Sequence, residues 1–385
     1  MSFPSRIILP DNGKNLLRRE VAAAFAALGL EVARVDPAVI ADVERPEGLA
    51  RLLEAGPALL LSINFQAVER PRPVLEALER AGSRAAVWCV DNPWNILAGV
   101  RDPSWKSIPF FVTDKSFVEP LRLAGAEKVF HLPLAACPEL FGDSCPPEPS
   151  EIAPLAFVGR LAFPGKETFF AGIELSPELL REAEALSGTG GRPDFSWWSK
   201  RLGCDPALFW PGKKARPAAL GAEICSVRLR TASLAAAAEV GAELAGGGPG
   251  LDIFGDAPER LPAGARVHPP VDYYTRLPCI YRKARYSLCC TSLLLPHGLN
   301  QRHFDIWAAG GVCLTDNTPG LDLFPKELTR ATTFEQPEAI PAVVRALEKM
   351  PESARAALIQ DRRNFLIAEH TYAHRARAIL EACGA

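Results

Sequence analysis

Short apolar runs alternate with amphipathic segments along the first 150 residues, and this rhythm constrains the fold more than any other feature. Strands are predicted at residues 6–9, 31–35, 58–63, 85–90, 110–113 and 128–132. Helices are predicted at residues 15–28, 46–55, 74–81 and 116–124. Strands that alternate with helices in this way favour an open parallel sheet whose two faces are both covered by helices.

The same rhythm returns in the second half of the chain. Strands are predicted at residues 154–158, 251–255, 265–268, 286–290 and 312–315. Helices are predicted at residues 277–284, 300–309, 337–349 and 354–382. The pattern over 163–245 is helical but irregular, and we interpret this stretch as an insertion. We therefore predict an α/β protein with two tandem doubly wound domains, which would bind ligands in a cleft at the carboxyl ends of their strands.

The boundary between the two domains is expected in the proline-rich stretch at 143–154, DSCPPEPSEIAP. A length of 385 residues agrees with two domains, since a domain takes about 150 residues. We predict an N-terminal domain at 1–150 and a C-terminal domain at 151–385, whose last helix is placed to pack back on the N-terminal domain.

Composition excludes several classes of function. Lys and Arg number 43 and Asp and Glu number 45, so the chain lacks the basic excess that nucleic-acid binding needs. No targeting segment is expected, and no stretch of 18 apolar residues without a charge predicts a transmembrane helix. The ten cysteines form no CxxC pair, and we interpret them as buried thiols of a cytoplasmic protein, without a metal.

The stretch PHGLNQRHFDIWAAGGVCLTDNTPGLDLFP, residues 296–325, is the best candidate for chemistry. A loop enters a helix near Arg302, where free backbone amides and a guanidinium favour an anion such as a diphosphate. Asp305 follows about one helical turn later, on the same side, and its carboxylate suits the hydroxyls of a ribose. The alternative is that Arg302 and Asp305 only pair with each other on the helix surface.

Strand ends in the first half supply further candidates. Asp91 follows the run VWCV, where a carboxylate is a candidate base for an acceptor hydroxyl; the alternative is a cap for the turn before Pro93. His131 ends another strand and is either a catalytic group or an ordinary turn histidine. Asp11, Asn12 and Gly13 form a loop after the first strand, which we expect to line the ligand site.

Several motifs together resemble the CgeB-like glycosyltransferases, relatives of the group 1 glycosyltransferases. The helix start and the strand after it match at Asn300, Arg302, Phe304, Asp305, Gly310, Gly311, Leu314, Thr315, Asp316, Leu323 and Phe324. The closing helix matches at His370, Thr371, Tyr372, His374 and Arg375. Strand ends and the preceding helix match at Gly159, Arg160, Gly255, Leu277, Pro278, Tyr281 and Ala284. The likeness extends to Asp91, which lies in a segment similar to the family's D-[DN]-P-[WYF] signature.

The resemblance implies a GT-B fold of two Rossmann-like domains, in which the N-terminal domain forms the acceptor side and the C-terminal domain binds the nucleotide sugar. Arg302 would lie at the diphosphate and Asp305 at the ribose. The full set of expected donor-binding residues is Gly159, Arg160, Gly255, His268, Tyr281, Lys283, His297, Asn300, Arg302 and Asp305. Of these, His268 is expected near the base. His297 stands where many group 1 enzymes carry a glutamate, and Asp305 is often glutamate in relatives, so the sugar and the stereochemical outcome stay open.

The resemblance also implies a glycosyltransferase that uses a nucleotide sugar, most simply a UDP-sugar, and no further cofactor. The acceptor is expected to be a hydroxyl of a protein such as flagellin or of a surface glycan. The sequence has no D-x-D motif, so we expect metal-independent transfer. Two alternatives remain: a nucleotide-sugar epimerase or hydrolase of the same fold, and a non-catalytic, structural CgeB-like protein.

Overall fold

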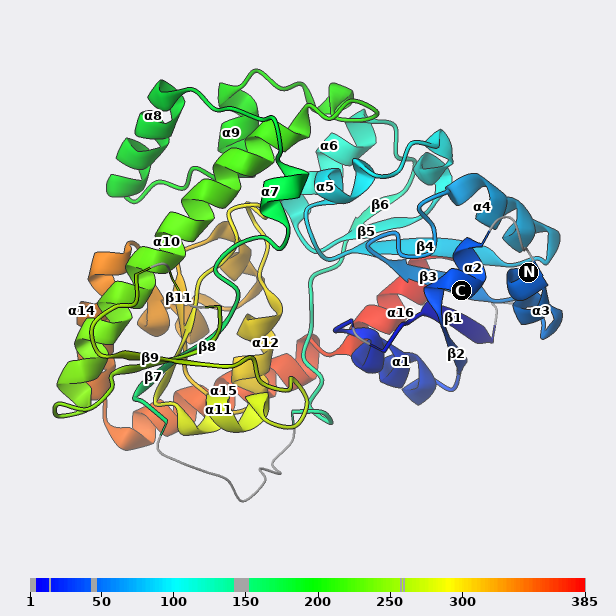
Figure 1. The fold of residues 1–385 in the computed structure, drawn as a ribbon. Coiled ribbons are helices and arrows are strands. Elements are labelled where there is room, and N and C mark those ends of the chain that lie inside the picture. The colour runs from blue at the N-terminus through cyan, green and yellow to red at the C-terminus, as the bar shows by residue number, and fades with distance from the viewer. Residues whose placement is uncertain are drawn as a thin grey trace. The chain divides into compact units, whose positions relative to one another are not determined.

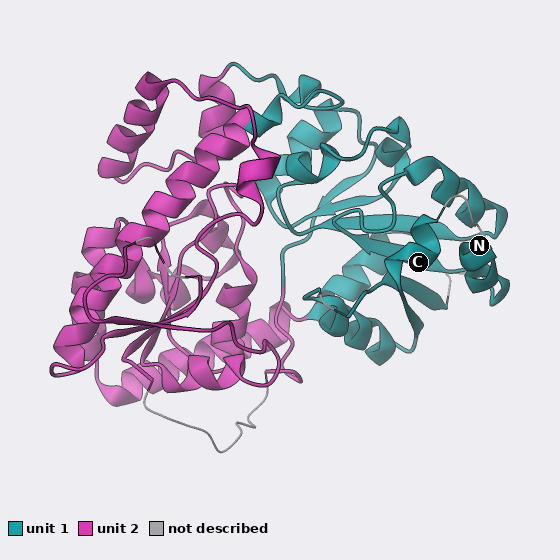
Figure 2. Ribbon diagram, viewed as in Figure 1, with its two compact units in different colours: residues 1–134, 203–216, 372–385 teal, residues 135–202, 217–371 magenta. Residues whose placement is uncertain are grey.

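The computed structural model of the chain describes residues 5–13, 15–42, 47–141, 152–256, 258 and 260–384. The chain divides into two compact units, which Figure 2 shows in different colours. Unit 1 comprises Met1–Leu134, Gly203–Arg216 and Tyr372–Ala385, and unit 2 comprises Ala135–Leu202 and Pro217–Thr371. Most of the predicted linker at 143–154 lies outside the described residues.

Unit 1 contains the predicted parallel sheet. Its strands are β1 (Arg6–Pro10), β2 (Glu31–Val35), β3 (Leu59–Ile63), β4 (Arg84–Cys89), β5 (Phe110–Val112) and β6 (Val129–His131). They pair in the order β2-β1-β3-β4-β5-β6, and every pair is parallel. Since β1 and β3 are buried along their whole length, they appear in the sequence as nearly continuous apolar runs, interrupted only by Arg6 and Ser62.

Helices cover this sheet (Figure 1). They are α1 (Arg18–Ala27), α2 (Pro37–Ala41), α3 (Glu47–Glu54), α4 (Pro71–Arg80), α5 (Pro93–Leu97), α6 (Val118–Leu123) and α16 (Tyr372–Ala382). The predicted helix at 15–28 begins only at Arg18, because Leu17 has a left-handed φ of 72°. The C-terminal helix α16 packs against α1, and the ring of Tyr372 lies 6.1 Å from that of Trp88.

Unit 2 contains a second parallel sheet. Its strands are β7 (Leu155–Gly159), β8 (Leu251–Gly255), β9 (Ala265–His268), β10 (Tyr286–Cys289), β11 (Cys313–Asp316) and β12 (Thr333–Phe334). Their order, β12-β11-β10-β7-β8-β9, runs outward in both directions from β7 and β10. This is the strand order of the Rossmann fold. The sequence did not predict β12, which at two residues is too short to show a period.

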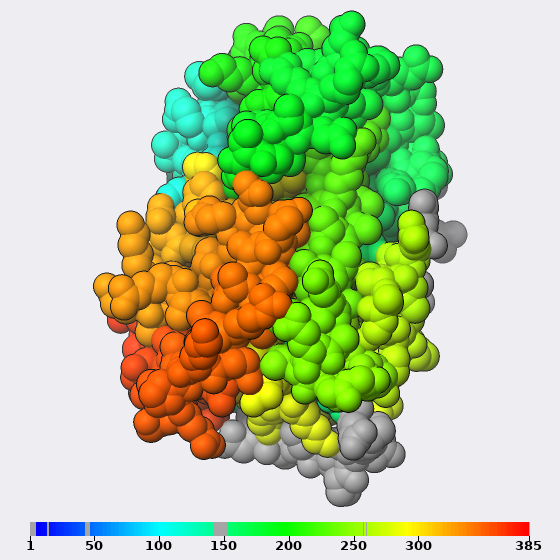
Figure 3. Space-filling view, turned by 90° about the vertical axis from the view of Figure 1, so that its left-hand side faces the viewer, coloured from blue at the N-terminus to red at the C-terminus, as the bar shows by residue number. Residues whose placement is uncertain are grey.

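The helices of unit 2 include the predicted insertion. They are α7 (Lys166–Phe169), α8 (Pro177–Gly188), α9 (Phe195–Arg201), α10 (Ala215–Leu244), α11 (Leu277–Lys283), α12 (Gln301–Ala308), α13 (Lys326–Thr329), α14 (Ile340–Glu348) and α15 (Glu352–Glu369). Short 3-10 turns occur in unit 1 at η1 (Pro103–Ser107), η2 (Lys115–Phe117) and η3 (Pro206–Leu208), and in unit 2 at η4 (Pro319–Leu323), η5 (Arg330–Thr332) and η6 (Pro337–Ala339). In Figure 3, α10 and α14 lie side by side, where Arg345 pairs with Glu243.

The single helix predicted at 354–382 is wrong, because the structure has two helices there, α15 and α16. The break falls at His370 and Thr371, whose backbone pairs with Ala136 instead of continuing the helix. The Ala136 N–H donates to the His370 carbonyl at 2.8 Å. A contact this distant in sequence leaves no trace in the helical period.

Eight of the cysteines in the described part of the chain are free thiols, and seven of them are buried. This agrees with the interpretation of most cysteines as small apolar residues. Cys279, on α11, differs from that expectation because it forms a disulfide bond. Among the described residues, no helix is both long enough and apolar enough to cross a membrane.

Candidate functional site

The strand order of unit 2 reverses between β7 and β10, and ligands of such sheets bind at this point, beyond the carboxyl ends of the strands. Two glycines mark the ends of the strands here. Gly159 ends β7 with a φ of 145°, and a Cβ there would overlap the guanidinium of Arg302. Gly255 ends β8 with a φ of 139°, and a Cβ there would overlap the Gly159 carbonyl. The structure thus brings three predicted donor-site residues together.

The start of α12 is fixed to the end of β10 by Asn300. Its side-chain oxygen accepts from the Arg302 N–H at 3.1 Å, and its amide donates to the Cys290 carbonyl at 3.2 Å. The first turn of α12 therefore begins beside the strand end, with Arg302 half-buried against Gly159. A guanidinium at the start of a helix, where the helix dipole is positive, is suited to an anion.

Asp305, one turn along α12, is buried rather than on the helix surface. Its two carboxylate oxygens accept hydrogen bonds of 2.7 Å, one from Gln301 Nε2 and one from the Tyr273 hydroxyl. Gln301 also donates to the Ala135 carbonyl at 2.9 Å. A ribose hydroxyl that binds Asp305 would have to share the carboxylate with these donors or displace one of them.

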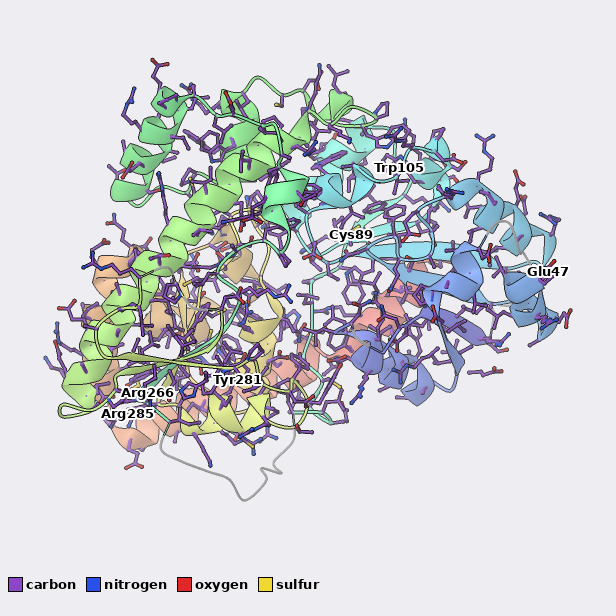
Figure 4. All side chains as sticks on the ribbon, viewed as in Figure 1. Glu47, Cys89, Trp105, Arg266, Tyr281 and Arg285 are labelled. Atoms are coloured by element: carbon purple, nitrogen blue, oxygen red, sulfur yellow. The ribbon has the colours of Figure 1, made fainter. Side chains whose placement is uncertain are left out.

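Tyr281, labelled on α11 in Figure 4, is the buried aromatic residue of this region. Its hydroxyl has no hydrogen-bond partner among the residues that the structure describes. Burial raises the pKa of Tyr281 well above its usual range, and the nearby charge of Arg302 only partly opposes this. The hydroxyl therefore keeps its proton and remains a potential donor.

A polar cluster lies under α12, where Cys289, His303 and Cys313 are buried with their ligand atoms within 4.8 Å of one another. His303 Nε2 lies 2.8 Å from Thr315 Oγ1, and His303 Nδ1 lies 3.6 Å from Cys289 Sγ. Cys289 Sγ also donates to Asn300 Oδ1 at 3.1 Å, and burial raises the pKa of this thiol well above its usual range. We interpret the cluster as hydrogen-bonded packing that orients α12.

The remaining predicted donor residues are spread over unit 2. Arg160 and Lys283 are exposed, and His297 is half-buried in the loop before α12. His268 lies on the edge strand β9, where its Nε2 is 2.9 Å from Asp252 Oδ1 and its ring stacks on Phe254 at 4.6 Å. These contacts fix the ring of His268 on the strand, and its expected position near the base stays a prediction.

In unit 1, Asp91 follows β4, two residues after Cys89 (Figure 4). The cap of α5 is Asn92, whose side chain accepts from the Trp94 N–H at 3.0 Å, so Asp91 is not needed for that turn. Asp91 keeps contact with solvent, yet the surrounding protein desolvates its carboxylate and raises its pKa. A raised pKa suits a carboxylate that has to accept a proton near neutral pH.

Asn64, which the sequence analysis missed, holds Asp91 in place. Its amide donates to Asp91 Oδ2 at 2.7 Å, and its carbonyl oxygen accepts from the Val90 N–H at 2.9 Å. The loop after β3 is strained, since Asn64, Phe65 and Ala67 have φ values of 55°, 60° and 68°. Such backbone conformations are concentrated at functional sites. The sequence feature that could have identified Asn64 is its position as a polar residue directly after the apolar run ALLLSI.

The other unit 1 candidates have different surroundings. Asp11 is buried and accepts from Arg34 Nε at 2.6 Å and from the Gly13 N–H at 2.8 Å, so it shapes its own loop. Asn12 and Gly13 are exposed. His131 is exposed at the end of β6, and desolvation lowers its pKa, which keeps the imidazole neutral at pH 7.

Part of the chain is similar to a known protein family. Residues 230–381 match a family model described as glycosyl transferase-like, which is less than half of the chain. The matched stretch includes β8 to β12 and α12, so Arg302 lies in the part of the chain that is similar to this family, whereas Gly159 lies before it. No curated protein matches the chain.

Solved structures also resemble the chain over nearly its whole length, and two of them serve as examples. The Anabaena protein Alr3699/HepE, in complex with UDP-glucose, has a TM-score of 0.51 at 9% identity and covers 98% of this chain and 99% of its own. Sucrose-phosphate synthase from Thermosynechococcus elongatus has a TM-score of 0.49 at 12% identity, with 98% and 97% covered. The HepE likeness and the two six-stranded parallel sheets confirm the predicted α/β GT-B fold.

Proposed function

We propose that the protein is a glycosyltransferase that moves a sugar from a nucleoside-diphosphate sugar to an acceptor hydroxyl. The observation that carries the proposal is the position of Arg302, against Gly159 and at the start of α12, in the ligand-binding crevice of a Rossmann fold. The match of this part of the chain to glycosyl transferases supports the class of reaction.

On the donor side, transfer breaks the bond between the sugar and the diphosphate, which leaves with additional negative charge. Arg302 and the N–H groups of α12 would stabilise that charge without a metal ion. Asp305 would accept hydrogen bonds from the ribose, in exchange for Tyr273 or Gln301. We propose UDP as the nucleotide, which the UDP-glucose bound to HepE supports.

On the acceptor side, we propose Asp91 as the base that takes the proton of the attacking hydroxyl. Its carboxylate is exposed and is held by the Asn64 amide. We further propose a CgeB-type enzyme of the cytoplasm that glycosylates a protein or a surface glycan. The eight free thiols of the described residues support a reducing compartment, whereas the disulfide of Cys279 counts against it.

A nucleotide panel tests the donor assignment. Melting temperatures are measured with UDP, GDP, dTDP, CDP and ADP, for wild type and for Arg302→Ala. A ligand at about 100 times its Kd stabilises the folded state by roughly 2.7 kcal/mol, which a melt resolves. We expect a shift with UDP that the variant loses. Equal turnover of the UDP-sugar with and without acceptor would instead favour a hydrolase or epimerase.

A further inference from the structure

A cavity of about 450 Å³ lies between α7 and α10, entirely within unit 2. Its wall is mainly apolar and includes Phe170, Ile173, Leu220, Ile224 and Val227. The volume falls within the range of about 300–1,000 Å³ that is usual for small-molecule sites. The size and the lining are those of a pocket for one apolar group of moderate size.

The apolar residues that α10 contributes to this wall form a partly exposed stripe along the helix. Leu220, Ile224 and Val227 recur at the i, i+4 and i+7 positions, so they form one stripe along the helix. All three remain partly exposed, whereas Ala218 and Ala222 on the other side of α10 are buried in unit 2. An apolar stripe that the fold does not cover is available to a ligand.

Four charged side chains also line the pocket, and of these only Glu223 is buried, at 2% exposed, while Lys166 is half-buried and Glu167 and Arg228 are exposed. The Glu223 carboxylate accepts a short hydrogen bond from the Phe163 N–H. Burial raises the pKa of Glu223, against the lowering effects of that hydrogen bond, Arg230 and Lys166. The carboxyl group of Glu223 therefore already has a hydrogen-bond partner in the protein, and it does not require a cationic ligand.

The pocket is connected to the Arg302 crevice by a short segment of chain. Gly159 ends β7 against Arg302, and the four residues that follow lead to Phe163, whose N–H binds Glu223. Arg230, also on α10, donates to the Leu161 carbonyl at 2.7 Å. The helix that forms the pocket wall thus also holds the segment that leaves the crevice.

We propose that this pocket binds an uncharged apolar group of the acceptor, aromatic or branched aliphatic, next to the donor crevice. The assignment rests on the proposed glycosyltransferase function. The acceptor hydroxyl must reach the sugar while the diphosphate lies at Arg302, and a pocket joined to that crevice by the 159–163 segment holds the acceptor close to it. Of the two acceptor types proposed above, the pocket favours a protein hydroxyl with an apolar group beside it over a surface glycan made only of polar sugars.

The test uses N-phenyl-1-naphthylamine, an uncharged aromatic probe that fluoresces in apolar sites. We compare wild type with Ile224→Arg, which places a charge in the pocket, and with the milder Val227→Thr. Leu261→Arg is the matched control, because Leu261 is an exposed apolar residue of unit 2 (46%) outside the pocket. We expect probe affinity at least about tenfold weaker in Ile224→Arg, a smaller loss in Val227→Thr and none in Leu261→Arg.

A second measurement links the pocket to transfer. Pairs of acceptor analogues that differ only in a methyl or a 4-nitrophenyl substituent are compared with a UDP-sugar as donor. We expect the aryl analogue to displace the probe and to react faster in wild type, and Ile224→Arg to lose this preference while its melting shift with UDP persists.

The two proposals fail separately. Absence of probe binding, or an equal loss in Leu261→Arg, together with a UDP shift in wild type, overturns the pocket and leaves the glycosyltransferase proposal standing. Probe binding without any nucleotide shift contradicts the donor site, and the assignment of the pocket to an acceptor falls with it.

Discussion

The guanidinium of Arg302 lies so close to the backbone of Gly159 that any side chain at residue 159 would overlap it. Gly159 also has a φ of 145°, which other residues avoid. The glycine at the end of β7 and the arginine at the start of α12 are therefore parts of one structure. Neither can be interpreted alone.

This relationship predicts that Gly159→Ala acts on the ligand site through Arg302. We expect the variant to lose most of the UDP-induced melting shift and to be destabilised by about 1–3 kcal/mol from backbone strain. Gly172→Ala is the control, because Gly172 also has a positive φ, 74°, but nothing lies within 4 Å of its added Cβ. If Gly159→Ala shows the same UDP-induced melting shift as wild type, the proposed effect of Gly159 on the ligand site through Arg302 is wrong.

Asp91→Asn tests the proposed base. Loss of the carboxylate should lower the transfer rate by about a hundredfold or more, the usual contribution of a general base. The melting shift with UDP should not change, since Asp91 has no part in donor binding. Glu79→Gln, an exposed carboxylate on α4, is the control. Full transfer activity in Asp91→Asn would exclude the assignment.

Asn64→Gly removes the amide that holds Asp91 and keeps the left-handed backbone accessible. The Asn64 hydrogen bond favours the charged carboxylate and so lowers the pKa of Asp91. Without it the pKa rises, and the carboxylate becomes protonated at a higher pH. The acidic limb of the transfer rate against pH should therefore move to higher pH. A lower rate with an unmoved limb would indicate a purely structural role.

The Asp252 network predicts a pH-dependent stability. Burial alone would raise the pKa of Asp252, but hydrogen bonds from Arg266, the Ala153 N–H and His268 lower it overall. This stabilisation is present above the unfolded-state pKa, about 3.9, and is lost as pH falls through the folded-state value. Asp252→Asn should cost about 1–3 kcal/mol at pH 7. The difference in Tm from wild type should shrink between pH 5 and pH 2, and a constant difference would contradict the account.

The packing of α10 against α9 predicts that replacing Gly221, a glycine within α10, destabilises the protein. A helical Gly→Ala change usually stabilises by about 1 kcal/mol, but a Cβ at Gly221 would overlap the buried indole ring of Trp198. Gly221→Ala should therefore lower Tm. Gly188→Ala, in α8, should leave Tm unchanged or raise it, because nothing lies within 4 Å of its added Cβ. Equal Tm changes in the two variants would rule out this packing.

The sheets could be predicted because their strands are buried on both faces. A strand such as β3 is apolar at nearly every position, and its period is visible without knowledge of its neighbours. The late start of α1 and the break before α16 depend on the left-handed Leu17 and on the pairing of Ala136 with Thr371. Both are set by tertiary contacts, which a local pattern does not encode.

The candidate site likewise contains features that the sequence could predict and features that it could not. Arg302 was accessible from sequence, because a helix start after a strand has a local signature. The burial of Asp305 under Tyr273 was not, since it requires the loop after β9 to fold over α12. The role of Asn64 was also hidden, because Asn64 and Asp91 lie 27 residues apart and meet only when β3 and β4 pair.

The most direct test of the central claim is the rate of sugar transfer from a UDP-sugar by wild type and Arg302→Ala, measured together with UDP binding. Arg330→Ala, at an arginine exposed on η5, is the control. The account predicts that Arg302→Ala loses at least about tenfold in transfer, equivalent to roughly 1.4 kcal/mol of barrier, and loses the UDP shift. Unchanged transfer and an unchanged UDP shift would contradict it.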